Sequence, residues 1–491
     1  MRAFSFLLAA ALAGAIWGQN AGGSASDGTT PLHWAVHDND ADQVKRLIAS
    51  GANVNAKNDF GATPMSEAAT VGNTAVIKML LEAGADADSP YADGQTALMV
   101  IARTTNVEAA KLLLDHGAHV NAIENQRNQT ALMWAAAQRQ SEMVKLLVAR
   151  GADPNAHTMI NDVQSQVSAE PRAQYRSYGG LTPLIYATRE GCVDCTRYLV
   201  DGGAKIDMAD PEGVTPLIMA ITNFHFDTAQ YLIKAGANVD KWDWWGRSPL
   251  WCAVDLNTIP HGGRADAPSL DETSSLDIIR MLLDKGAYPN PQLKLLPPYR
   301  SIGADRGVDG MLTIGATPLL RAAKAQDAPA IALLLKAGAL PDLPNNRGIT
   351  SVQAAAGMGS VDADTRGRYD TSDVQQRSLD SLKLLLDAGG DLMAKDGRGQ
   401  TAMHAAAFWG WNDVVKYLAD RGADLNAKDN RGMTPIDSAM GRNGGNSRGG
   451  ARIDVHQDTA DLLVKLGATP VVAPAKPPAA GPKPAGAKPG R

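Results

Sequence analysis

This sequence of 491 residues has few of the residues that build covalent cross-links or aromatic cores. Its only cysteines are Cys192, Cys195 and Cys252, too few for the disulfide framework of a small secreted scaffold. Aromatic residues make up 5% of the chain, so the core must consist mainly of aliphatic side chains. No apolar run after the N-terminal stretch is long enough to span a bilayer, and we expect no integral membrane segment.

The signatures of common catalytic sites are absent as well. The sequence has no GxSxG nucleophile elbow, no HExxH zinc motif and no phosphate-binding loop. Nine histidines are scattered along it, and His116 and His119 straddle an expected helix end, where they do not share a face. Asp362 and Asp364 lie in an expected loop, and we interpret them as a chance pair of acidic residues rather than as the catalytic carboxylates of a glycosidase. We therefore predict no catalytic residue, no metal site and no cofactor.

Gly-Ala or Gly-Gly pairs recur along the chain. Half of the successive intervals are 33 or 34 residues, and the others exceed this period by an insertion. Such a period is typical of a solenoid, in which stacked repeats contact only their neighbours. The first glycines of these pairs are Gly51, Gly84, Gly117, Gly151, Gly203, Gly236, Gly286, Gly338, Gly389, Gly422 and Gly467.

A second motif keeps the same frame, as Thr30-Pro31-Leu32-His33-Trp34-Ala35 shows at the start. A Thr hydroxyl caps a helix N-terminus, and Pro is tolerated just inside it. A glycine ends the second helix, because it adopts the left-handed conformation without strain. Equivalent Thr or Ser residues are Thr63, Thr96, Thr130, Thr182, Thr215, Ser248, Thr317, Thr350, Thr401 and Thr434.

This unit resembles the ankyrin repeat, and the resemblance covers residues 27–469 with about eleven repeats. It implies an all-α ankyrin-repeat solenoid of stacked helix-turn-helix units with β-hairpin fingers. It also implies that His33 and His404, which share one frame position, tie neighbouring loops together. Members of the family usually bind proteins on the concave face of fingers and inner helices and share no catalytic site. We therefore expect a protein that is not an enzyme.

The two ends of the chain differ from the repeats. Residues 1–18 carry Arg2 and a short apolar run, which predicts a secretory signal peptide, followed by a linker at 19–26. Residues 470–491 are rich in Pro, Ala and Lys without an acidic residue, which predicts a disordered tail. We expect an exported protein, periplasmic or secreted. The tail either contacts an anionic envelope weakly or only stays solvated.

The overall charge argues against nucleic-acid binding. The chain has 52 acidic and 47 basic residues, and four of the basic ones lie in the tail. The repeats are therefore acidic, unlike a basic nucleic-acid-binding surface.

Cys192 and Cys195 lie where an outer helix is expected to begin. They either form a redox couple or local disulfide, or occupy ordinary core positions. We favour the core interpretation, because Cys195 stands where other repeats have Val76 or Met143. Cys252 stands at the position of Trp34 and Trp134, and we expect these residues in the core. We also expect Cys252 to be too far from Cys192 and Cys195 to bond with them.

Five insertions separate this chain from a uniform array. Those near 157–179 and 291–314 enlarge fingers, and those near 257–274, 357–377 and 440–457 enlarge turns between the two helices of one repeat. Arg and Tyr are enriched where proteins bind one another, so the insertions either bind a partner or pack on the solenoid. Their candidate binding residues are Tyr175, Arg176, Tyr299, Arg300, Arg366 and Arg368.

Two tryptophan groups add candidates. Trp242, Trp244 and Trp245 crowd one finger, where they form a costly exposed patch unless a partner or an insertion covers them. Trp409 and Trp411 lie beside Phe408 in a turn, where packing against an insertion explains them more simply.

We therefore expect a scaffold that binds a protein or peptide. The alternatives are a protein that binds envelope polysaccharide or peptidoglycan by stacking on Trp and Tyr, and, least favoured, an enzyme built from inserted loops.

Overall fold

A computed structural model describes residues 25–161, 177–257, 270–295, 313–359, 373–442 and 455–470. The chain divides into two compact units. Unit 1 comprises Met1–Leu256 and Pro268–Ala287, and unit 2 comprises Asn257–Ala267 and Tyr288–Arg491. The expected signal peptide and the expected tail, apart from residue 470, lie outside the described residues.

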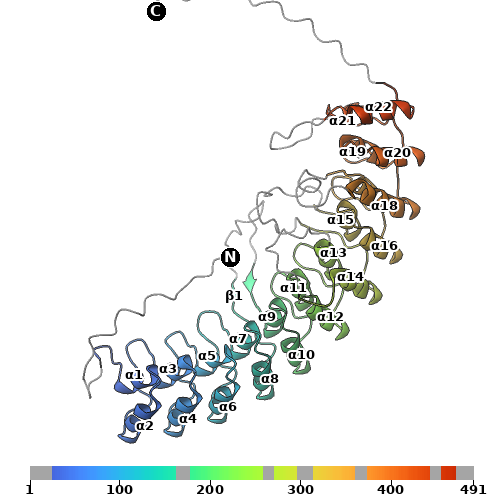
Figure 1. Cartoon of the computed structure of the whole chain (residues 1–491). Coiled ribbons are helices and arrows are strands. Elements are labelled where there is room, and N and C mark those ends of the chain that lie inside the picture. The colour runs from blue at the N-terminus through green and yellow to red at the C-terminus, as the bar shows by residue number, and fades with distance from the viewer. Residues whose placement is uncertain are drawn as a thin grey trace, which may run out of the picture. The chain divides into compact units, whose positions relative to one another are not determined.

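Unit 1 is a stack of helix pairs. In each pair we call the first helix inner and the second outer, and in Figure 1 the inner helices form one layer and the outer helices another. The helices are α1 (Pro31–His37), α2 (Ala41–Ala49), α3 (Pro64–Val71), α4 (Thr74–Glu82), α5 (Ala97–Ala102), α6 (Val107–Asp115), α7 (Ala131–Ala137), α8 (Ser141–Ala149), α9 (Pro183–Arg189), α10 (Val193–Asp201), α11 (Pro216–Thr222), α12 (Phe226–Lys234), α13 (Pro249–Asn257), which ends at the unit boundary, and α14 (Ser275–Asp284).

Unit 2 repeats the same arrangement. Its helices are α15 (Pro318–Lys324), α16 (Ala328–Lys336), α17 (Ser351–Ala355), α18 (Val374–Asp387), α19 (Ala402–Phe408), α20 (Asn412–Asp420), α21 (Pro435–Ala439) and α22 (Gln457–Lys465). The expected helical repeat fold is thus confirmed.

The sequence signals for helix ends act as expected. The Thr30 hydroxyl accepts a hydrogen bond from the backbone N–H of His33 at 3.4 Å, and Thr317 does the same for Leu320 at 3.1 Å. Pro318 occupies the first turn of α15, where its missing N–H leaves no bond unmade. All eleven glycines of the ladder have φ between 85° and 109°, so each ends its outer helix in the left-handed conformation.

The core lies between successive helix pairs. Ala135 and Ala136 of α7 are fully buried, and α7 packs against both α5 and α9. On the outer helix α8, Met143, Val144 and Leu147 form one buried stripe. Small residues on the inner helices therefore permit close packing of neighbouring repeats.

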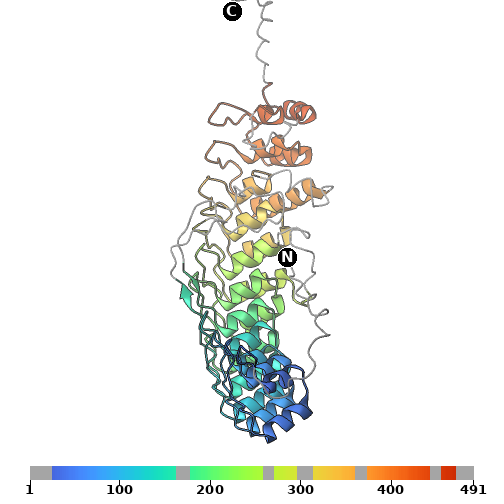
Figure 2. The ribbon, with the colours of Figure 1, turned by 90° about the vertical axis from the view of Figure 1, so that its left-hand side faces the viewer.

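The loop from each left-handed glycine to the next inner helix is a finger, and Figure 2 shows that within each unit the fingers project from one side of the helix pairs. One strand pair occurs in the described residues, β1 (Ile160–Asn161) antiparallel to β2 (Tyr178–Gly179). The other described fingers are turns without a ladder. An Asp or Asn side chain holds the tip of several of them, as Asp429 does by accepting the N–H groups of Arg431 and Met433 at 2.8 and 2.9 Å.

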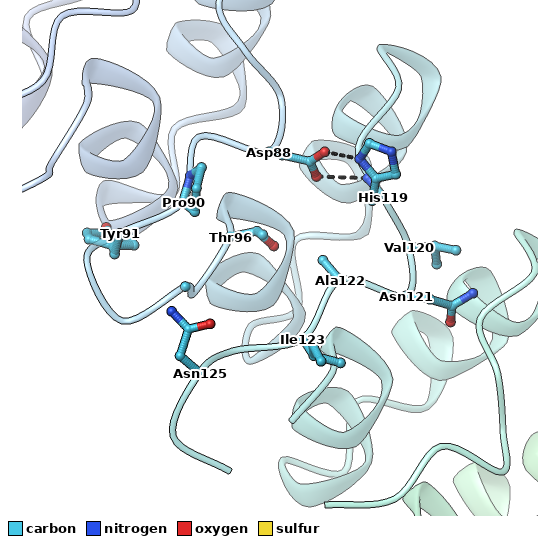
Figure 3. Close-up of a pocket in the computed structure, with 11 residues that line it drawn as sticks. Asp88, Pro90, Tyr91, Thr96, His119, Val120, Asn121, Ala122, Ile123 and Asn125 are labelled. Atoms are coloured by element: carbon cyan, nitrogen blue, oxygen red, sulfur yellow. Dashed lines mark hydrogen bonds and ion pairs between the residues drawn. The ribbon is translucent and has the colours of Figure 1, made fainter. Parts of the chain in front are cut away.

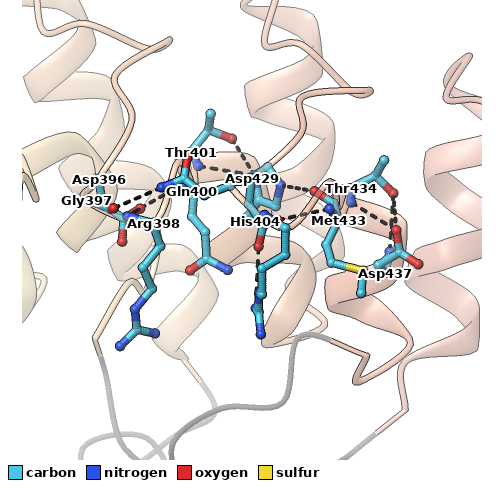
Figure 4. Close-up of polar contacts among 12 residues, drawn as sticks. Asp396, Gly397, Arg398, Gln400, Thr401, His404, Asp429, Met433, Thr434 and Asp437 are labelled. Carbon is cyan, nitrogen blue, oxygen red and sulfur yellow. Dashed lines mark hydrogen bonds and ion pairs between the residues drawn. The ribbon is translucent and has the colours of Figure 1, made fainter.

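Histidines connect repeats as the family resemblance implied. His33 Nε2 lies 3.1 Å from the carbonyl oxygen of Ala62, and His404 Nε2 lies 3.2 Å from that of Met433, each in the next finger. Figure 4 shows His404 between Thr401 and Met433. These side chains therefore couple an inner helix to the following finger.

Described residues flank the five expected insertions. The segments 162–176, 258–269, 296–312, 360–372 and 443–454 within them lie outside the described residues. One described part has a definite structure: α18 begins at Val374, inside the expected 357–377 insertion, and reaches 14 residues where most outer helices have nine. Within the described ranges, no helix combines the length and hydropathy needed to cross a membrane.

Candidate functional site

The finger at residues 238–248 of unit 1 places its three tryptophans differently. Trp242 and Trp244 are 53% and 43% exposed, whereas Trp245 is 2% exposed. The backbone N–H of Trp244 donates to the carbonyl oxygen of Glu212 in the preceding finger at 2.7 Å. The finger thus holds two indoles at the surface on an ordered backbone.

Trp245 is part of the interior that supports this finger. The guanidinium of Arg247 lies 4.8 Å from the centre of a Trp245 ring and 2.7 Å from the Asp243 carboxylate, and both charged side chains are buried. Asp243 also accepts the backbone N–H groups of Trp245 and Arg247. A buried ion pair with this many hydrogen bonds fixes the turn geometry. Trp245 therefore lies in the interior, behind the exposed side chains of Trp242 and Trp244.

The inner helices of unit 1 add a surface that the sequence interpretation missed. Trp34, expected in the core, is 53% exposed, and its ring meets His37 edge-on. Trp134, also expected in the core, is half-buried, with the guanidinium of Arg103 4.5 Å from its ring centre. The expectation is wrong for Trp34, whose side chain faces outward from α1, whereas Trp134 packs against the core of unit 1 with part of its surface exposed.

One signal in the sequence identifies this outward position. Successive repeats place Trp34, Glu67, Val100 and Trp134 there, whereas the position two residues earlier keeps an apolar residue such as Leu32 or Leu132. A position that tolerates both charge and large apolar groups is typical of a surface. Finger tips show the same variation, and Phe60 at one tip is 69% exposed.

A pocket of about 690 Å³ lies between two fingers of unit 1. Figure 3 shows Asp88 pointing to His119 across it, with Tyr91 and Ile123 among its lining residues. The hydrogen bond from His119 to Asp88 raises the pKa of His119. Burial raises the pKa of Tyr91, whose hydroxyl donates to the Ser66 carbonyl oxygen. In this open groove Asp88 and His119 are bonded to each other, and the Asn121 side chain bonds the backbone of Gly151 and Asp153.

The second tryptophan group belongs to unit 2 and packs inward. Trp411 is 7% exposed and stacks on Trp409, whose Nε1 donates to the carbonyl oxygen of Gly357 at 2.8 Å. Phe408 meets Trp409 edge-on and is partly exposed. The two indoles thus close the turn after α17.

The other candidate binding residues are those of the insertions. Tyr175, Arg176, Tyr299, Arg300, Arg366 and Arg368 all lie outside the described residues.

Cys192 and Cys195 form a disulfide at the start of α10, and both side chains are buried. The pair is therefore a local cross-link as well as a core element, which corrects the favoured interpretation of plain core residues. Cys252 is buried and lies outside this bond. Across the residues that the structure describes, no group of three or more His, Cys, Asp or Glu side chains could hold a metal ion.

Comparison with known proteins gives one family. The family model described as ankyrin repeats in three copies matches residues 5–91, 77–158, 159–243, 204–293 and 373–472, more than half of the chain. No curated protein matches the sequence. Among solved structures, the ankyrin repeat domain of Bcl-3, described as a unique member of the IkappaB protein family, is similar at 25% identity. The match covers 46% of this chain and 93% of that chain, with a TM-score of 0.38.

Proposed function

Because the chain belongs to the ankyrin-repeat family, we propose that it is a non-catalytic scaffold that binds a protein or peptide on the fingers and inner helices of unit 1. Ankyrin repeats generally mediate protein–protein interaction. The observation that carries the proposal is the exposed pair Trp242 and Trp244 on an ordered finger. Tryptophan is among the residues that contribute most to binding energy when a partner buries it.

On the inner helices, Trp34 and Trp134 add further aromatic surface to unit 1. Arg103 on Trp134 and Glu67 near His37 add charged groups that orient a ligand. Aromatic anchors with adjacent charges fit a polypeptide, which offers both apolar side chains and carboxylates or amides.

The test compares the full chain with the double variant Trp242→Ala/Trp244→Ala. Trp245 is left unchanged, because its removal would open the interior of the finger. Met393→Ala is the control, since Met393 is 47% exposed on a finger of unit 2. Circular dichroism first shows that all three proteins are folded. Each is then immobilised, and the proteins retained from an extract of the source cells are quantified by mass spectrometry.

We expect the parent and Met393→Ala to retain the same partner and the tryptophan variant to lose it by roughly tenfold or more, as for loss of a binding hot spot. Equal retention by all three proteins contradicts the proposal. Loss of co-sedimentation with purified peptidoglycan in the tryptophan variant, with no protein partner lost, supports the polysaccharide alternative instead.

A further inference from the structure

A row of three arginines crosses consecutive finger tips of unit 2. Arg347, Arg398 and Arg431 each directly precede a left-handed glycine, and all three are exposed. We call them the arginine row. At the same position, described fingers of unit 1 carry a mixture of residue types with one arginine: Phe60, Asp93, Arg127, Glu212 and Trp245.

The three tips have the same backbone geometry. The N–H of Arg347 donates to the Asn345 side chain at 2.9 Å, and that of Arg398 to Asp396 at 2.9 Å. The N–H of Arg431 donates to Asp429 at 2.8 Å. The backbone of each arginine in the row is therefore held in an equivalent way.

Hydrogen bonds between the tips fix their register. The N–H of Gly397 donates to the carbonyl oxygen of Arg347 at 2.7 Å, and that of Asn430 to the carbonyl oxygen of Arg398 at 2.8 Å. Glycines permit this approach: a Cβ on Gly348 would lie 3.0 Å from the backbone nitrogen of Gly397. The arginines thus form one aligned series.

The nearest carboxylates face into the fingers. In Asp396 and in Asp429, one carboxylate oxygen accepts hydrogen bonds from two backbone N–H groups of the same turn. Arg431 makes a 3.4 Å contact with Asp429, while Arg398 and Arg347 form no ion pair with any residue that the structure describes. In Figure 4 the Arg398 side chain extends away from the contact between Thr401 and His404. Exposed Lys395 and Lys428 add positive charge to the same fingers.

The carboxylates at the finger bases are also engaged. Asp342 accepts the N–H of Asp391, Asp391 accepts that of Met393, and Asp424 accepts that of Asn426. The positively charged side chains are therefore the more accessible ones at the finger tips, although the fingers as a whole contain both positive and negative charges.

We propose that the arginine row binds an acidic polypeptide segment in an extended, polyproline-like conformation with a carboxylate at every third residue. Helices of neighbouring repeats pack about 8–10 Å apart, which sets the spacing of the row. A polyproline helix advances about 9 Å in its three-residue turn, so every third side chain falls on one face at a matching interval. Arginine binds carboxylates through two parallel hydrogen bonds, which gives the match its specificity.

The charge of the whole chain favours a polypeptide over a nucleic acid. The net charge is −5, and single-stranded nucleic acids require a broad basic groove with stacking aromatics. The row offers three point contacts and no aromatic ring.

The proposal concerns unit 2 and is independent of the tryptophan pair in unit 1. The probe is a fluorescein-labelled synthetic peptide of consecutive Glu-Pro-Pro triplets, and its control is a peptide of the same composition with all glutamates adjacent. Fluorescence anisotropy at low salt measures binding to the full chain, to Arg347→Gln/Arg398→Gln/Arg431→Gln, and to Arg127→Gln. Arg127 is the matched control, because it stands at an exposed finger tip of unit 1 and the preceding tip carries Asp93 at the same position.

We expect the parent to bind the triplet peptide more tightly than the control peptide, and added salt to weaken the binding. The triple variant should lose roughly tenfold in affinity, since three exposed ion pairs of modest strength are removed together. Arg127→Gln and Trp242→Ala/Trp244→Ala should bind like the parent. Unchanged binding by a folded triple variant, equal binding of both peptides, or tighter binding of polyuridylate than of the peptide each overturns the proposal.

Discussion

At the scale of single residues, the finger tips show how one backbone role is filled by different side chains. Asp210, Asn58 and Asn345 each accept two backbone N–H groups of their finger turn. Either an amide oxygen or a carboxylate oxygen can accept these bonds, but only the carboxylate carries a charge. Burial, together with the nearby charges of Glu212 and Asp243, raises the pKa of Asp210 to about 6.

This raised pKa predicts how Asp210→Asn changes stability with pH. The unfolded-state pKa of an aspartate is about 3.9, so the folded state binds the extra proton and loses stability as pH rises through about 6. Asparagine keeps the acceptor and avoids this loss. We expect Asp210→Asn to be more stable than the parent at neutral pH and the advantage to shrink below pH 6, as measured by urea unfolding across this range.

Asp429→Asn is the matched control with the opposite sign. Burial alone would raise the pKa of Asp429, but the N–H groups of Met433 and Arg431 and the Arg431 charge hold it below its usual value. Its ionised form therefore stabilises the fold above about pH 4, and that stability is lost as pH falls through the lowered pKa. Asp429→Asn should be less stable than the parent at neutral pH. An advantage of Asp210→Asn that stays constant with pH would show that its ionisation plays no part.

At the scale of helices and turns, left-handed glycines serve two purposes. Gly422 ends α20 with φ 88°, and a Cβ there would meet no atom within 4 Å. Gly357 follows α17 with φ 97°, and a Cβ there would lie 2.7 Å from Trp409 and 2.8 Å from Trp411. The first glycine is needed for conformation alone, and the second also for packing.

Alanine substitution separates these purposes. Gly422→Ala should destabilise unit 2 by about 1–2 kcal/mol, the cost of a left-handed alanine. Gly357→Ala should cost about 1–3 kcal/mol more, because the stacked indoles must move and overpacking adds its own penalty. Urea unfolding followed by tryptophan fluorescence measures both. Equal costs would mean that the stack of Trp409 and Trp411 shifts freely.

At the scale of the whole molecule, each repeat contacts its neighbours, and stability is close to a sum of local terms. Asp210 lies in unit 1 and Gly357 in unit 2, and they share no partner among the described contacts. Long separation within such an array makes mutational effects independent.

The double variant Asp210→Asn/Gly357→Ala tests this independence. Its change in unfolding free energy at neutral pH should equal the sum of the single changes within about 0.5 kcal/mol. Denaturation of all four proteins under one condition completes the cycle. A larger deviation would reveal coupling that passes from unit to unit.

The amino-acid sequence by itself determined the repeat period, the helix starts at Thr-Pro and the helix ends at glycine. Each of these signals acts within about one helical turn, through a hydroxyl cap, a missing N–H or a permitted left-handed φ. The loop-tying role of His33 and His404 followed from the family resemblance, and the contacts to Ala62 and Met433 agree with it.

Only the tertiary structure decided which aromatic side chains reach the surface. Trp34 and Trp242 are exposed while Trp245 and Trp411 are buried, although all four lie near helix starts or in turns. Burial depends on what packs over a side chain, and some of those atoms come from distant parts of the sequence, as those of Gly357 do for Trp409 and Trp411. The alignment of Arg347, Arg398 and Arg431 has the same origin, because hydrogen bonds between fingers set their register. Local chemistry therefore fixed the repeat, and contacts between repeats fixed its surface.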